Sequence, residues 1–141
     1  MTTETVNFAT TLRDLGLGEG WTWDKGSWWL EPQEAMDLRA TTTRMTQLQA
    51  RFVAISAIEL ADKSMRLNYQ WDLDGKLLSF ACATSGGRIA TIADLCPAAD
   101  WVERETHEYF SVDFTGREST LALMTRAGDQ LGINLHQAVT V

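Results

Sequence analysis

The chain has 141 residues, the size of one ordinary domain, and 45% of them are hydrophobic, enough for a substantial core. Its formal net charge is −7, and no basic cluster stands out, which argues against nucleic acid as a partner. The sequence shows no apolar stretch of roughly 20 residues that could span a membrane, no secretion signal, and only two cysteines, too few for a disulfide framework or a four-thiolate cluster.

The first third of the chain predicts a helix, a hairpin and a second helix. An apolar face with helical spacing near the N-terminus ends at a run of glycines that begins at Gly16. The segment WTWDKGSWWL (residues 21–30) predicts a short hairpin with a loop at 24–26. Pro32 suits the first turn of a helix that extends to about Ala50. The apolar faces consist of Phe8, Leu12 and Leu15 in the first helix and Ala35, Leu38, Met45 and Leu48 in the second.

Three strands are predicted next. Residues 51–59 are apolar on both faces and rich in β-branched side chains, which predicts a buried central strand. Residues 65–73 alternate strictly between apolar and polar, so one face should meet the core and the other water. Asp74-Gly75 then favours a two-residue hairpin turn. This turn predicts a register with Trp71 opposite Leu78, Tyr69 opposite Phe80, and Leu67 opposite Cys82.

The remaining sequence predicts helices and an irregular tail. A helical segment is expected from Arg88, because Thr91-x-x-Asp94 resembles a capping box. A second helix is expected over 97–111, and an irregular tail from about 112 to 141. The order of elements predicts a single two-layer α+β domain of residues 1–141. Its sheet should be mostly antiparallel, a hairpin plus three further strands, with helices packed on one face.

The stretch PAADWVERETHEYFSVDFTG, residues 97–116, gathers carboxylates among aromatic side chains. On a helix, Glu105 borders the apolar stripe and should be half-buried, where its charge needs a donor. Arg104 and Glu108 should form an exposed pair one turn apart. The stripe expected to face the sheet consists of Ala98, Val102, Thr106 and Tyr109.

Metal and acid/base chemistry find little support in this helix. Glu103 and His107 lie one turn apart, but two ligands do not close a metal site, and the other histidine is His136. Glu103 and Glu105 fall on different faces of the helix, and no nucleophilic triad motif occurs. We therefore expect no catalytic residue, no metal and no cofactor in this chain. Two alternatives remain open, a small hydrolase that uses Glu105 and a small-molecule-binding domain with a pocket lined by Trp21, Trp23, Trp28 and Trp29.

The same stretch resembles the C-subunit family of respiratory complex I, the NADH–quinone oxidoreductase, and its counterparts in energy-converting nickel–iron hydrogenases. Three positions depart from the family pattern and favour a compact, hydrogenase-type relative: Ser111, Arg117 and Leu121. The matching residues are Pro97-Ala98-Ala99, Trp101, Glu103-Arg104-Glu105, Glu108, Tyr109-Phe110 and Phe114-Thr115-Gly116.

The resemblance implies a non-catalytic docking subunit without a redox cofactor. Proteins of this kind pack against the large hydrogenase-like or quinone-site subunit, beside other subunits of the extrinsic arm. They lie on the cytoplasmic face of the cell membrane without spanning it. Dimerisation of the isolated chain, the electron donor and the acceptor remain open. The docking residues implied by the motif are Trp101, Glu103, Arg104, Glu105, Glu108, Phe110, Phe114 and Arg117.

Overall fold

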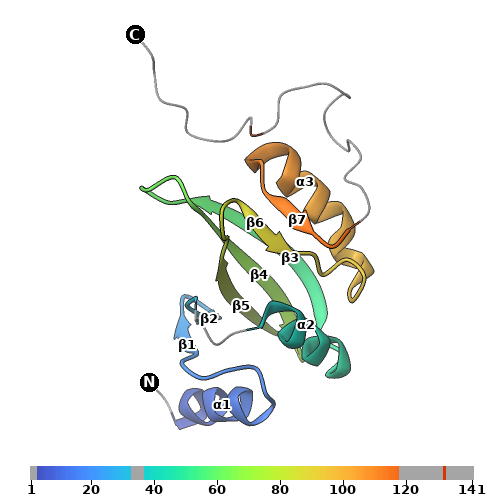
Figure 1. Cartoon of the computed structure of the whole chain (residues 1–141). Helices are drawn as coiled ribbons and strands as arrows, with labels where there is room; N and C mark the ends of the chain where they lie inside the picture. Colours follow the sequence, from blue (N-terminus) through green and yellow to red (C-terminus); the bar gives the residue numbers. More distant parts are fainter. Residues whose placement is uncertain (1–2, 33–36, 118–131, 133–141) are drawn as a thin grey trace.

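The computed structural model describes residues 3–32, 37–117 and 132 of the chain, and Figure 1 shows how their elements are arranged. In chain order these elements are α1 (Thr3–Asp14), β1 (Thr22–Asp24), β2 (Ser27–Leu30), α2 (Leu38–Gln47), β3 (Arg51–Glu59), β4 (Met65–Leu73), β5 (Lys76–Ala83), β6 (Arg88–Ala90), the 3-10 helix η1 (Pro97–Ala99), α3 (Asp100–Phe110) and β7 (Asp113–Thr115).

Five strands form the main sheet in the order β1-β2-β5-β4-β3. All neighbouring strands are antiparallel except β2 and β5, which are parallel. The hairpin β4–β5 turns at Asp74 and Gly75, whose φ angles of 51° and 81° are those of the favoured two-residue turn. The predicted register is confirmed, with Trp71 opposite Leu78, Tyr69 opposite Phe80, and Leu67 opposite Cys82.

One face of this sheet carries the core. Tyr69, Trp71 and Phe80 are fully buried there, and Leu12 of α1 and Met45 of α2 join them in one hydrophobic cluster. Figure 1 shows α1 and α2 near one end of the sheet and α3 near the other. The two-layer α+β architecture is therefore confirmed.

The first of the three strands differs from the prediction in its position. β3 has the predicted bounds, but it pairs only with β4 and forms an edge of the sheet among the described residues. Val53 and Ile58 are exposed. β3 is the last strand of the sheet, so no strand pairs with its outer edge among the described residues. A bulge between Phe52 and Ala54 shifts the register within this strand, a common feature of edge strands.

The N-terminal helix and the first hairpin are confirmed, but the second helix begins later than predicted. α2 starts at Leu38, because Asp37 takes an extended conformation and its side chain accepts from the backbone amides of Arg39 and Ala40. Pro32 lies outside this helix. Ala35, which was expected on its apolar face, lies outside the described residues.

The segment from Arg88 is a strand rather than a helix. β6 pairs in parallel with β7, so the predicted irregular tail also begins with a strand. The two strands provide hydrogen-bond partners for each other's backbone although they lie about 25 positions apart in the sequence. Local sequence preferences do not reveal a pairing between segments so far apart. The rest of the predicted tail, 118–131 and 133–141, with Leu121 and His136, lies outside the described residues. None of the described helices has the length and apolar character needed to cross a lipid bilayer.

Candidate functional site

The helix predicted over 97–111 is present as η1 followed by α3, and its C-terminal end is fixed by local contacts. Ser111 ends the helix in a left-handed conformation with φ of 57°, and its N–H donates to the His107 carbonyl at 3.0 Å. The His107 Nδ1–H donates to the Val112 carbonyl at 2.9 Å. Because this turn is held on both sides, β7 returns beside β6 and α3 packs against β3.

Glu103 lies at the centre of the inward face of α3 and is fully buried. Its carboxylate accepts from the Thr91 hydroxyl at 2.5 Å, from the Ile92 amide at 2.8 Å and from Arg117 Nη1 at 2.9 Å. Burial raises the pKa of Glu103 above its usual value, against the hydrogen bonds from Thr91 and Ile92 and the charge of Arg117. The residue therefore joins α3 to the segment before it and to the end of β7.

Arg117 completes this internal network. Its Nη1 binds Glu103, and its Nη2 donates to a carboxylate oxygen of Asp100 in the first turn of α3. The other carboxylate oxygen of Asp100 lies 3.9 Å from Arg104 Nη1, one turn further along. The Arg117 side chain is only 12% exposed, so this predicted docking residue lies largely inside the isolated chain.

A second set of contacts ties α2 to the same segment. Arg39 of α2 binds both carboxylate oxygens of Asp94, at 2.8 and 2.7 Å, and donates to the Thr91 carbonyl at 2.7 Å. The side-chain hydrogen bond from Arg39 lowers the pKa of Asp94 to about 2. Thr91 and Asp94 therefore do not form the predicted capping box, since their polar groups are used by Glu103 and Arg39.

Sequence reasoning missed Arg39, Thr91, Asp94 and Asp100 as partners of the motif. Arg39 and Asp94 are separated by 55 positions, and no local pattern links them. The one available signal was the polar pair Thr91 and Asp94 after a glycine-rich turn, which was interpreted as a helix start.

The face assignment of α3 also differs from the prediction. Glu105, expected to be half-buried, is exposed, and Glu108, expected on the exposed side, is 2% exposed. The donors of Thr91, Ile92 and Arg117 draw Glu103 inward, so Glu105, two positions further on, faces outward. Glu108 does not lie on this inward face, and its backbone carbonyl accepts from the Gly132 amide at 2.8 Å, so a later part of the chain contacts the helix there. The residues that follow the inward spacing are Ala99, Glu103, Thr106 and Phe110, the last of them half-buried.

The outward face of α3 carries one large apolar side chain. Trp101 is 66% exposed, more than any other exposed large apolar residue in the described part of the chain. Glu105 is exposed one turn further along, and the Arg104 side chain is 19% exposed. Of the other predicted docking residues, Phe110 is half-buried and Phe114 is buried.

The tryptophan-rich hairpin does not form the predicted pocket with all four indoles. Trp21 is buried and its Nε1–H donates to the Leu17 carbonyl at 3.1 Å. Trp29 follows Trp28 on the same strand and therefore points to the opposite face of the sheet. Of the four, Trp23 and Trp28 line the pocket that the described residues form beside α1.

No candidate metal site is present in the described residues, because they contain no group of three or more His, Cys, Asp or Glu side chains placed to hold an ion. His107 and Glu103, the pair considered as ligands, are occupied by Val112 and by the Thr91, Ile92 and Arg117 donors. The arrangement at α3 is thus a helix held by a buried polar network on its inner side, with the indole of Trp101 exposed on its outer side.

Comparisons with known proteins identify the family and the fold. The family described as respiratory-chain NADH dehydrogenase, 30 kDa subunit, matches residues 30–131. A chain of the membrane-bound sulfane sulfur reductase, an archaeal respiratory membrane complex, is similar in structure with a TM-score of 0.64 and 18% identity, over 83% of this chain and 73% of that one. A trypsin-resistant fragment of Nqo5 is similar with a TM-score of 0.62 and 16% identity, over 79% of this chain and 98% of that one. No curated protein matches the sequence.

Proposed function

Because the chain belongs to the 30 kDa-subunit family of the respiratory-chain NADH dehydrogenase, we propose that it is a non-catalytic docking subunit of a membrane-associated electron-transfer complex. The predicted docking motif supports this role in two ways. Its inner residues, Glu103 and Arg117, hold α3 in place. Its outer residues, Trp101 and Glu105, are left for a partner.

The exposure of Trp101 carries the proposal. An indole that is 66% exposed is a large apolar surface in contact with water, and tryptophan is among the residues that dominate binding energy at protein interfaces. The helix that carries Trp101 is fixed by a buried network, so little conformational entropy is lost when the side chain docks. Glu103, Glu108 and Phe114 are buried, so in this proposal they support the surface rather than contact the partner.

The proposed partner is the large hydrogenase-like or quinone-site subunit of the same complex, with other subunits of the extrinsic arm beside it. The whole chain, residues 1–141, acts in this proposal as one domain, placed on the cytoplasmic face of the membrane by its partners. The electron-transfer chemistry then belongs to the partners, and this chain contributes shape and contacts. Glu105 does not favour the hydrolase alternative, because an exposed carboxylate lacks the enclosed surroundings that tune a catalytic acid or base.

Co-purification tests the proposal. The chain is expressed with the large subunit of its complex, an affinity tag is placed on the large subunit, and the retained amount of this chain is measured. We expect Trp101→Ala to reduce retention by roughly five-fold or more, as for the loss of an interface anchor. Leu60→Ala removes another exposed apolar side chain and serves as the matched control, with retention unchanged.

The melting temperature of each isolated variant is measured in parallel, so that loss of folding is not taken for loss of binding. Full retention of Trp101→Ala would show that α3 is not the docking element. A wild-type chain that does not co-purify with the large subunit would contradict the docking function itself.

A further inference from the structure

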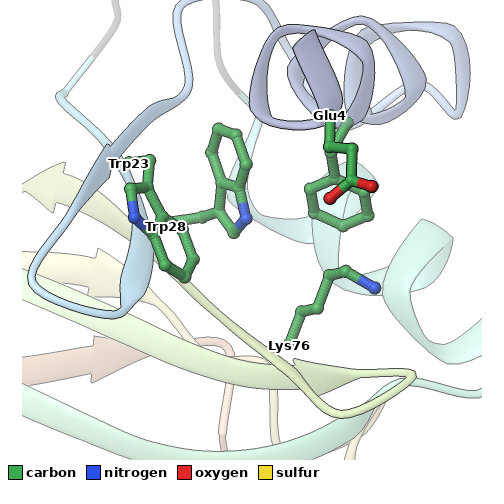
Figure 2. Close-up of a pocket in the computed structure, with 5 residues that line it drawn as sticks. Glu4, Trp23, Trp28 and Lys76 are labelled. Atoms are coloured by element: carbon green, nitrogen blue, oxygen red, sulfur yellow. The ribbon is translucent and has the colours of Figure 1, made fainter. Parts of the chain in front are cut away.

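A pocket of about 250 Å³ lies at the other edge of the sheet from α3, between α1, the β1–β2 hairpin and the start of β5. Figure 2 shows Glu4 reaching into this region from α1 and Lys76 from β5, with the indoles of Trp23 and Trp28 on the opposite side. The pocket is lined by Glu4, Phe8, Trp23, Trp28 and Lys76. Four of these five residues precede residue 30, where the match to the family begins.

The three rings form the walls of a box rather than a stack. The Phe8 and Trp28 centroids are 5.2 Å apart with planes tilted by 49°, and those of Trp23 and Trp28 are 5.5 Å apart at 62°. Rings at such angles present several π faces and edges to one volume. Trp23 is 46% exposed, so the box is open to a partner, whereas Trp28 is nearly fully buried and anchors it.

The rings already attract one positive charge. The Lys76 Nζ lies 4.8 Å from the centroid of the Phe8 ring, within the range of a cation–π contact. The carboxylate of Glu4 forms no ion pair with a residue that the structure describes, and it lies at the rim of the pocket. A net charge of −7 on the chain adds a long-range attraction for cations.

The chemistry of the pocket walls indicates the occupant. Sites for free small ligands usually measure about 300 to 1,000 Å³, and this pocket, at about 250 Å³, lies just below that range. A guanidinium stacks on an aromatic face and pairs with a carboxylate at the same time, which a compact ammonium does less well. Aromatic walls and a carboxylate at the rim are the two elements that this group requires.

We infer that the pocket receives the guanidinium of an arginine side chain from a partner subunit, stacked on Trp23 with Glu4 as its counter-ion. This inference rests on the proposed docking function and adds a second contact at the opposite edge of the sheet from Trp101. The Lys76 ammonium lies beside the expected position of the guanidinium and repels it. In the free chain this ammonium lies over the Phe8 ring.

Glu4 and Lys76 carry opposite charges, so removal of each charge should change the affinity for a cation in opposite directions. The purified chain is titrated with N-acetyl-arginine amide, and the indole N–H signals are followed by NMR. We expect the signals of Trp23 and Trp28 to shift and those of Trp29 and Trp101 to stay in place. Glu4→Gln should weaken binding and Lys76→Met should strengthen it, each by roughly two- to five-fold, the range of an exposed cation–π or ion-pair contact. Equal shifts with N-acetyl-glutamine amide, or reversed effects of the two variants, would overturn the inference.

The assembled complex supplies the second part of the test. Glu4→Gln and Trp23→Ala should each lower retention of the chain on the tagged large subunit, with unchanged melting temperatures of the isolated variants. If both variants are retained like the wild type while Trp101→Ala is lost, the arginine pocket is wrong and the docking function stands. If the wild-type chain is not retained at all, the docking function fails, and the partner arginine fails with it.

Discussion

Glu103 illustrates how a carboxylate comes to occupy an inward position on a helix. Three donors converge on it, from the Thr91 hydroxyl, the Ile92 amide and Arg117, so its desolvation is offset by hydrogen bonds and one charge. Glu105, two positions further on, has turned by about 200° and meets water. Two glutamates of one motif therefore have different physical roles, one in folding and one on the surface.

This difference predicts unequal effects of two alanine variants. Glu103→Ala leaves Arg117 and the Thr91 hydroxyl without their shared partner in a buried place, which should lower the free energy of unfolding by about 3 kcal/mol. Glu105→Ala removes an exposed side chain and should change it by less than about 0.5 kcal/mol. Urea titrations of both isolated variants measure the difference. A silent Glu103→Ala would mean that the donors around it are satisfied by other groups.

At the scale of elements, the β4–β5 hairpin is the most strongly determined part of the fold. The turn at Asp74-Gly75 and the alternation of both strands are local and agree with one another, and together they place Tyr69, Trp71 and Phe80 on one face. Phe52 of β3 adds an edge-to-face contact to Trp71 with centroids 5.2 Å apart. The result is an aromatic layer that α1 and α2 help to cover.

Replacement of Trp71 tests this layer. Trp71 is fully buried, so Trp71→Ala should lower the free energy of unfolding by about 3 kcal/mol, the lower end for a large buried aromatic. The lower end applies because the Trp71 Nε1–H has no hydrogen-bond partner among the described residues, and the variant removes that unpaired donor. Gln70→Ala, on the opposite face and half-buried, should cost much less. Equal losses in a denaturant titration would contradict the register.

An element could be predicted from the sequence when the residues that determine it are neighbours in the chain. The hairpin turns, the α1 face and the start of the helix at Pro97 are set by neighbouring residues, and the sequence predicted them. β3 is an edge strand because it pairs with β4 alone, whereas β4 lies between β3 and β5. A run of apolar residues does not distinguish an edge strand from a central one. The pairing of β6 with β7 and the inward turn of Glu103 depend on partners 11 to 25 positions away, for which the sequence alone offered no sign.

At the scale of the whole molecule, one ion pair connects the N-terminal helical part to the motif. Arg39 of α2 holds Asp94 with both of its terminal nitrogens and also binds the Thr91 carbonyl, while the Thr91 hydroxyl reaches Glu103 on α3. A continuous set of polar contacts thus runs from α2 through the segment before α3 to the docking helix. Because Arg39 and Asp94 are both partly exposed, this connection is modest in energy and sensitive to salt.

The acid sensitivity of this connection can be measured. The pKa of Asp94 is lowered to about 2 in the folded chain, mainly by the hydrogen bond from Arg39, whereas an unfolded aspartate titrates near pH 4. The folded state therefore binds fewer protons than the unfolded state in this window, and the stability that the pair contributes is present above about pH 4 and is lost as the pH falls toward 2.

Asp94→Asn should accordingly lower the melting temperature slightly at pH 7, and the difference from the wild type should shrink between pH 4 and pH 2.5. Glu105→Gln removes the same charge from an exposed position on α3 and is the matched control for the change in net charge. With this control subtracted, a difference that stays constant down to pH 2.5 would show that the Arg39–Asp94 pair does not stabilise the fold. A difference that shrinks toward low pH in dilute buffer, and is small at every pH in 1 M salt, would assign the effect to this pair, because screening weakens exposed charges.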